Sequence, residues 1–440
     1  MKTVRLFPSL AVLPVLLTVG ILTAPAAQAQ ITLQVTRDKD SPVYDTGETV
    51  TWNLKVTGDG ADAIQGIDYD VKRDLGTKIT SGTLPVTADA AQLTAKLDQP
   101  GTLVADFGFT DAAGRTVRKT VGVVVDPDHI PASAPEPDDF EAFWNSKVDE
   151  LDKVPINPVV TPMPSDVDGV DYAQVTLDNI RGTHLHAQIA RPTAGDKFPA
   201  ILLLQYAGVY ALPKAWVTNQ ARRGWLAMDV NAHDLPIDQP DQFYKDQAAG
   251  PLANYVAIGD TGRETSYFLR MALGTRRAVE YLQSRPDWNG QVLVASGTSQ
   301  GGLQSLMAAA LSPAVTQVMV DVPAGCDATG PQIGRSVPWP YWYANAKGNA
   351  AVMTTSRYYD GVNFARHVKV PTLVGVGLID LTATAPGVIA MFNQIQSPAK
   401  KLVILEFSDH HGTGGAQAPF YRAQGEWMEA LAKNEPLPGN

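Results

Sequence analysis

The sequence predicts an α/β domain with a mostly parallel central sheet, preceded by an all-β sandwich. Three observations lead to this prediction. Short strands with alternating apolar side chains fill the first part of the chain, a proline-rich segment follows, and almost continuously apolar strands then alternate with helices. With 440 residues, of which 45% are hydrophobic and 18% charged, the chain has enough apolar material for two cores.

The first 29 residues have the layout of a targeting segment. Lys2 and Arg5 precede an apolar run over residues 10–22, and Ala27-Gln28-Ala29 provides the small residues of a cleavage site. The run is shorter than the roughly 20 apolar residues that span a membrane. We therefore expect a signal peptide over residues 1–29 and a secreted or periplasmic protein that makes no use of a membrane.

Residues 30–125 are predicted to form an immunoglobulin-like β sandwich. Apolar side chains alternate from Val50 to Val56, as in a half-buried strand, and Gly58-Asp59-Gly60 provides a turn. The region contains no histidine and is thus a poor place for acid–base chemistry. Carbohydrate binding, placement over a neighbouring active site and a structural appendage are the roles it suggests. The expected strands are 31–36, 49–57, 64–72, 92–97, 102–110 and 115–125.

Four prolines make residues 126–137 an extended linker, because proline disrupts both helices and central strands. Residues 138–440 are predicted to form the α/β domain, beginning with a helix whose first residues are acidic. The expected buried strands are 199–205, 225–230, 292–295, 315–322, 372–376 and 402–407. The expected helices include 267–284, 303–311, 386–396 and 419–433. In such sheets the active residues gather at the carboxyl ends of the strands.

A nucleophile motif follows the strand at 292–295. Gly297-Thr-Ser299-Gln-Gly301 is a G-x-S-x-G pattern directly after an apolar strand and directly before a helix. A sharp strand-to-helix turn of this kind leaves no room for side chains at the glycine positions and exposes the serine hydroxyl. The pattern predicts Ser299 as a catalytic nucleophile.

Ser299 needs a general base and an acid that orients it, and in this topology they follow in the order acid, then histidine. After Ser299 only three histidines remain: His367 precedes a strand and falls at the wrong end of the sheet, whereas His410 and His411 follow the strand at 402–407. Either of these two fits the base. Asp380, after the strand at 372–376, is the expected acid, with Asp321 and Asp327 as alternatives.

An oxyanion needs two backbone N–H donors. We expect one from Gln300 and the other from Tyr206 or Ala207, in the loop after the strand at 199–205. Asn231 and His233 lie at another strand end and are candidate substrate contacts. An aromatic run beginning at Trp339 suggests either a sugar-stacking surface or a hydrophobic lid.

These motifs resemble the acetyl xylan esterase and cephalosporin C deacetylase family of α/β-hydrolases. The resemblance spans residues 137–434 and is carried by Asp138–Trp144, Arg276–Pro286, Gly297–Gly302 and Gly377–Asp380. It implies the α/β-hydrolase fold and deacetylation of sugars or other small acetylated compounds. It also implies Ser299 as nucleophile, Asp380 as acid, His411 rather than His410 as base, and Tyr206 at the oxyanion hole.

Two departures from the family pattern leave substrate choice and assembly open. The chain has Asn231-Ala-His233 where the family has Arg-Gly-Gln, and His411-Gly412 where the family has His-Glu. The resemblance otherwise implies a homo-oligomer.

The resulting hypothesis is a secreted serine esterase that removes acetyl groups from carbohydrate and needs no cofactor. Alternatives are another ester, a thioester or a peptide as substrate, or a noncatalytic carbohydrate-binding protein. The formal net charge of −10 argues against nucleic acid as a partner. His184 and His186 share a strand face, but without a neighbouring acidic or sulfur ligand in sequence we expect no metal site there.

Overall fold

A computed structural model describes residues 30–439 of the chain. The predicted signal peptide, residues 1–29, lies outside this part. Among the described residues, no helix has both the length and the apolar character needed to cross a bilayer.

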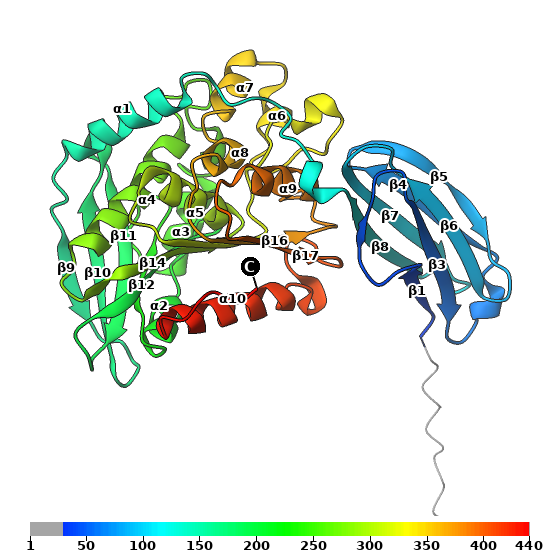
Figure 1. Cartoon of the computed structure of the whole chain (residues 1–440), viewed down its shortest axis with the longest axis horizontal. Helices are drawn as coiled ribbons and strands as arrows, with labels where there is room; N and C mark the ends of the chain where they lie inside the picture. The colour runs from blue at the N-terminus through cyan, green and yellow to red at the C-terminus, as the bar shows by residue number, and fades with distance from the viewer. Residues whose placement is uncertain (1–29, 440) are drawn as a thin grey trace, which may run out of the picture.

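The first part of the structure is a sandwich of two β-sheets around one core (Figure 1). The sheets have the strand orders β1-β3-β6 and β2-β8-β7-β4-β5. The alternation predicted from Val50 to Val56 is confirmed, since Val50, Trp52, Leu54 and Val56 are all buried. The strands are β1 (Thr32–Arg37), β2 (Val43–Tyr44), β3 (Thr49–Thr57), β4 (Gly66–Arg73), β5 (Thr77–Pro85), β6 (Ala90–Lys96), β7 (Gly101–Thr110) and β8 (Thr116–Val125).

The second part is built on a nine-stranded sheet with the order β17-β16-β15-β14-β12-β13-β11-β10-β9. The strands from β17 to β13 in this order pair in parallel, and β11, β10 and β9 continue the sheet antiparallel, so the predicted mostly parallel sheet is confirmed. The strands are β9 (Val159–Met163), β10 (Val170–Asp178), β11 (His184–Pro192), β12 (Phe198–Leu204), β13 (Leu226–Val230), β14 (Trp288–Thr298), β15 (Gln317–Asp321), β16 (Thr372–Gly377) and β17 (Lys400–Leu405).

Helices cover both faces of this sheet, as its apolar strands require. In Figure 1, α2 and α10 lie below the sheet, and the remaining long helices lie above it. Strand β14 has apolar side chains on both of its faces. Leu293 and Ala295 lie in the core on the side of α4 (Tyr267–Ser284) and α5 (Gln300–Leu311), whereas Val292 and Val294 lie in the core on the side of α2 (Ala215–Ala221) and α10 (Ala418–Ala432). The helices are α1 (Phe140–Asp152), α2 (Ala215–Ala221), α3 (Asp241–Ala249), α4 (Tyr267–Ser284), α5 (Gln300–Leu311), α6 (Trp342–Ala346), α7 (Ala350–Ser356), α8 (Gly361–Ala365), α9 (Ala385–Gln394) and α10 (Ala418–Ala432).

The proline-rich segment between the two parts is held firmly along the α/β domain. It contains one short 3₁₀ turn, Pro127–His129, and Ile130 is buried in the core of the α/β domain. The Asn393 side chain on α9 donates to the carbonyls of Pro127 and Ile130, at 2.8 and 3.0 Å. The sandwich is therefore docked against the α/β domain, beside β16 and β17 (Figure 1).

Candidate active site

Ser299 occupies the strained turn that the sequence predicts between β14 and α5. Its backbone has φ 59° and ψ −123°, a conformation that costs free energy in a residue other than glycine. Glycine is required on both sides. A Cβ on Gly297 would lie 2.4 Å from the carbonyl carbon of Gly301, and a Cβ on Gly301 would lie 2.0 Å from the carbonyl oxygen of Leu204. This close packing of β14, α5 and β12 fixes the position of Ser299.

A hydrogen-bonded chain links Ser299, His410 and Asp380. The Ser299 hydroxyl lies 2.9 Å from His410 Nε2, and His410 Nδ1 lies 2.7 Å from Asp380 Oδ2. Because an ionised carboxylate can only accept, His410 carries its proton on Nδ1 and leaves Nε2 free to accept the serine proton. Asp380 is fully buried, and its Oδ1 accepts the backbone N–H groups of Thr382 and Ala383, at 2.7 and 2.9 Å.

The structure thus puts His410, not His411, between the serine and the acid, and the choice of His411 from the family resemblance is corrected. The reason lies in the turn that follows β17. Asp409 Oδ1 accepts the backbone N–H groups of His411 and Thr413, at 3.1 and 3.0 Å, which turns the chain outward directly after His410. The ring of His411 is left on the exposed side of this loop, whereas the side chain of His410 is only 14% exposed.

The two alternative acids have other places. Asp327 pairs with Arg335 and accepts the backbone N–H of Ser133, so it belongs to the contact between the linker and the α/β domain. Asp321, at the end of β15, accepts the N–H of Ser299 with its backbone carbonyl at 3.0 Å. Its carboxyl group is buried, and burial, together with the negative charge of Asp380, raises its pKa to about 7. Asp321 supports the nucleophile turn through its backbone.

The two segments expected to provide the oxyanion donors meet beside the nucleophile turn, where Gly301 of α5 packs against Leu204 at the end of β12. Gln300 is the first residue of α5, so its N–H has no partner within the helix. Tyr206 follows β12, and its side chain is 44% exposed and stacks on Tyr210, with ring centroids 4.8 Å apart. The sequence did not predict what ties the two segments together: the Gln304 amide donates to the carbonyl of Gln205 at 2.8 Å. The available signal was a glutamine one turn into a mostly apolar helix.

Asn231 and His233, predicted as substrate contacts, are both buried and bond to the protein. His233 Nε2 lies 3.0 Å from the carbonyl oxygen of Gly208, and its Nδ1 lies 2.7 Å from the Tyr267 hydroxyl. Burial lowers the pKa of His233 to about 4, so it is neutral near pH 7. Asn231 Oδ1 accepts the backbone N–H of His233 at 2.7 Å. His233 thus supports the Tyr206–Gly208 loop from behind, and Asn231 holds the backbone of His233 in place while its own amide Nδ2 is buried without a hydrogen-bond partner among the described residues.

Trp339, the third predicted substrate contact, is also buried. Its ring packs edge-on against Phe268 of α4, with centroids 6.0 Å apart, and its backbone N–H donates to Thr382, beside the acid. The aromatic run is therefore a packed insertion in which Trp339 does not offer a surface for sugar stacking. Tyr341 and Tyr343 of the same run are exposed.

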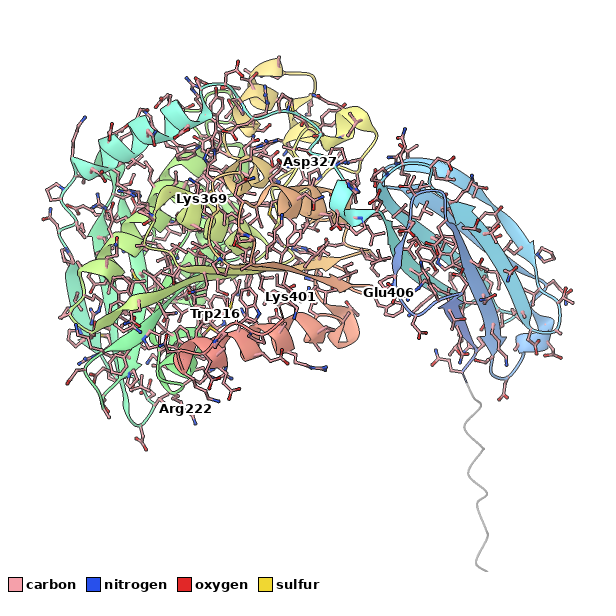
Figure 2. All side chains as sticks on the ribbon, in the orientation of Figure 1. Trp216, Arg222, Asp327, Lys369, Lys401 and Glu406 are labelled. Carbon is pink, nitrogen blue, oxygen red and sulfur yellow. The ribbon has the colours of Figure 1, made fainter. Side chains whose placement is uncertain are left out.

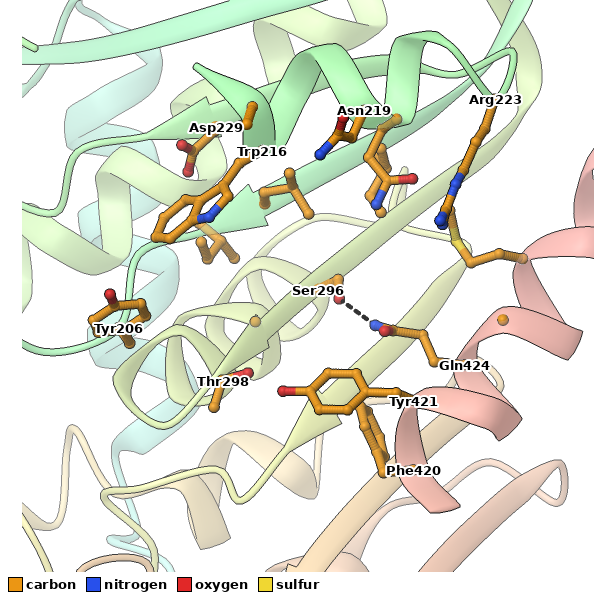
Figure 3. A pocket seen from close by; sticks show the side chains of 18 residues that line it. Tyr206, Trp216, Asn219, Arg223, Asp229, Ser296, Thr298, Phe420, Tyr421 and Gln424 are labelled. Atoms are coloured by element: carbon orange, nitrogen blue, oxygen red, sulfur yellow. Dashed lines mark hydrogen bonds between the residues drawn. The ribbon is translucent and has the colours of Figure 1, made fainter. Parts of the chain in front are cut away.

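A cavity of about 600 Å³ lies beside the nucleophile turn, on the side of the sheet covered by α2 and α10 (Figure 3). Its lining includes Thr298, which directly precedes Ser299 in the sequence. Across it, the Gln424 amide of α10 donates to the Ser296 hydroxyl at 3.0 Å (Figure 3). Its walls combine aromatic rings with amide, hydroxyl and charged groups. They include Tyr206, Trp216, Asn219, Arg223, Asp229 and Tyr421.

Metal and thiol chemistry find no support in the part of the chain that the structure describes. No group of three or more His, Cys, Asp or Glu side chains there is arranged to hold a metal ion. His186 lies 3.2 Å from Asp234, a neighbour that the sequence pattern did not reveal. Burial raises the pKa of the Cys326 thiol well above its ordinary value, which makes it a poor nucleophile.

Comparison with known proteins identifies the family of this chain. A family model described as acetyl xylan esterase (AXE1) matches residues 129–424. The acetyl esterase Axe7A of Xylanibacter ruminicola is 26% identical over 371 residues, which is 82% of this chain and 83% of that protein.

Two solved structures share the α/β-hydrolase fold of this chain. Acetyl xylan esterase 1 from Thermoanaerobacterium sp. JW/SL YS485 has a TM-score of 0.58 and 20% identity, and covers 67% of this chain and 96% of its own. The acetyl xylan esterase from Paenibacillus sp. R4 has a TM-score of 0.59 and 19% identity, and covers 70% and 98%.

Proposed function

Because the chain belongs to the acetyl xylan esterase family of carboxylic ester hydrolases, we propose that it is a secreted serine esterase that removes acetyl groups from carbohydrate. The observation that carries the serine mechanism is the hydrogen-bonded chain from Ser299 through His410 to Asp380, with 2.9 and 2.7 Å between the bonded atoms. A hydroxyl is a weak nucleophile near pH 7, and an imidazole at this distance can accept its proton as the new bond forms.

In the first half of the proposed reaction, Ser299 Oγ attacks the acetyl carbonyl carbon and its proton moves to His410 Nε2. The carbonyl oxygen becomes an oxyanion that accepts from the N–H of Gln300 and from the loop at Tyr206. Asp380 stabilises the positive charge on His410 through the Nδ1–H bond. When the tetrahedral intermediate collapses, the bond to the sugar oxygen breaks and Nε2 donates its proton to that oxygen.

In the second half, water replaces the sugar. His410 Nε2 takes a proton from the water as the water oxygen attacks the acetyl carbon of the acyl-serine. The second intermediate collapses, the bond from the carbonyl carbon to Ser299 Oγ breaks, and the proton returns to Ser299. Acetate leaves, and the three side chains regain their initial state without any cofactor.

The proposal of an acetylated carbohydrate rests on family membership and on the walls of the neighbouring cavity. Aromatic rings beside amide and hydroxyl groups, as offered by Tyr206, Trp216 and Asn219, suit the apolar faces and hydroxyl edges of a sugar (Figure 3). Secretion rests on the cation-flanked apolar run before Ala27-Gln28-Ala29.

Acetate release from acetylated xylo-oligosaccharide tests the proposal, with p-nitrophenyl esters of rising chain length and peptide amides as competing substrates. We expect the acetylated sugar to have the highest kcat/KM, and Ser299→Ala to lower kcat by at least about 10³-fold. Ser284→Ala is the matched control, because that exposed hydroxyl bonds only within α4. Activity of Ser299→Ala equal to that of the control would exclude the serine mechanism, and a preference for long acyl chains would exclude the acetyl substrate.

A further inference from the structure

We propose that the β sandwich is a positioning element of the active site, because it holds in place the two loops that carry the acid and the base. This inference rests on the roles proposed for Asp380 and His410. Both loops extend from strands at one edge of the nine-stranded sheet, where β17 is the last strand and β16 its neighbour. An edge strand has no further strand to pack against on its outer side. In this protein the sandwich lies there (Figure 1).

The acid loop is pressed against β8 of the sandwich. Gly122 approaches Leu378 so closely that a Cβ on Gly122 would lie 2.7 Å from the Leu378 Cβ and 3.0 Å from its carbonyl oxygen. Leu378 is fully buried, follows the end of β16 directly, and precedes Asp380 by two residues. Glycine at 122 is what permits this approach.

The base loop is held by two side chains of the sandwich. Arg37, the last residue of β1, forms an ion pair with Glu406, and these side chains are only 9% and 18% exposed. Lys119 of β8 lies over the ring of Phe407, 5.2 Å from its centroid. Glu406 and Phe407 precede His410 by four and three residues, and Figure 2 shows Glu406 on the side of the α/β domain that faces the sandwich. A partly buried ion pair fixes geometry better than an exposed one.

The docking is reinforced away from the catalytic loops. The Ser336 N–H donates to the carbonyl of Asp74 at 3.0 Å, and the Thr77 hydroxyl donates to the carbonyl of Gly334 at 3.0 Å. Val124 of β8 is fully buried in the core of the α/β domain. The sandwich therefore makes polar and apolar contacts with the α/β domain beyond the two loops, as a rigid support requires.

The catalytic consequence follows from how the two loops meet. They are joined by the Ile379 N–H, which donates to the Ser408 carbonyl at 3.3 Å, and by the 2.7 Å bond between His410 and Asp380. A displacement of about 1 Å at a reacting centre can reduce the rate about 10²-fold. Loss of a sandwich contact should consequently lower kcat with little change in KM, because the loops set the geometry of proton transfer.

A double-mutant cycle in the full chain tests this inference. Arg37→Met, Glu406→Gln and the double variant remove the ion pair without reversing charge. With p-nitrophenyl acetate as substrate, we expect each single variant to lower kcat about tenfold, with KM within about twofold of wild type. Because either change breaks the same contact, the double variant should be no slower than the slower single variant.

Arg115→Met is the matched control, since Arg115 pairs with Asp111 in the β7–β8 turn of the sandwich. It should keep wild-type kcat. Gly122→Ala provides an independent perturbation of the acid loop and should also lower kcat. Folded Arg37→Met and Glu406→Gln variants with wild-type kcat, or losses of kcat that multiply in the double variant, would overturn the inference. Failure of the serine mechanism is a separate result, because it would appear as an active Ser299→Ala.

Discussion

Gly301 connects the nucleophile turn to the oxyanion loop, and replacing it by alanine isolates the geometry of that turn. A Cβ on Gly301 would lie 2.0 Å from the carbonyl oxygen of Leu204, whereas Cβ atoms in proteins essentially never come within 3.0 Å of another heavy atom. The two segments must then separate by about 1 Å. Ser299 lies two residues before Gly301 and Tyr206 two residues after Leu204, so the displacement reaches both halves of the site.

The Gly301→Ala substitution has two opposing effects on the free energy of unfolding. Inserting a methyl group into a close-packed contact costs about 1–3 kcal/mol, and alanine in place of glycine within a helix returns about 1 kcal/mol. A displacement of about 1 Å predicts a loss of about 10²-fold in kcat. Gly425→Ala is the matched control, because Gly425 lies within α10 and its added Cβ would meet no atom within 4 Å. This control should stabilise the fold by about 0.5–1 kcal/mol and leave kcat unchanged.

Urea unfolding and the kcat for p-nitrophenyl acetate, measured on both variants, test whether the strained turn positions Ser299. We expect Gly301→Ala to be at most modestly destabilised yet nearly inactive. If Gly301→Ala gained the same stability as Gly425→Ala and kept at least half of the wild-type kcat, the strained turn would not be what positions Ser299.

Two further predictions concern buried carboxyl groups. Asp380→Asn keeps an acceptor for the Thr382 N–H but removes the charge that orients His410. We therefore expect kcat in an esterase assay to fall by about 10⁴-fold. A loss of less than tenfold would show that Asp380 is not the catalytic acid. Burial raises the pKa of Asp321 from 3.8 to about 7. The folded state therefore binds this proton more tightly than the unfolded chain does. As a result, the free energy of unfolding falls as the pH rises from about 4 to 7. Asp321→Asn should therefore gain stability relative to wild type between pH 4 and pH 8, by at most about 4 kcal/mol in urea unfolding, and an equal difference at both pH values would contradict this.

The elements that position the nucleophile could be predicted because runs of apolar residues mark them as buried. Helix α4 occupies Tyr267–Ser284 as predicted, and the strand and helix around Ser299 have apolar runs that only a buried element explains. Strand β5 was missed for the opposite reason. Thr77–Pro85 is an edge strand with mostly exposed side chains, so it carries no alternation of apolar and polar residues.

The site was predicted less completely, because its details depend on contacts between distant segments. His410 and His411 are adjacent in one loop, and only the hydrogen bonds of Asp409 decide which ring turns inward. His233 has the residue type and strand-end position of a substrate contact, yet it is buried behind the loop that it supports. The contact between Arg37 and Glu406 joins residues 369 positions apart and leaves no local pattern.

The most direct measurement is kcat/KM for acetate release by His410→Ala and His411→Ala, compared with wild type under identical conditions. We predict that His410→Ala loses at least about 10³-fold while His411→Ala stays within about threefold of wild type. The reverse pattern, with His411 essential and His410 dispensable, would contradict the arrangement of the three catalytic side chains.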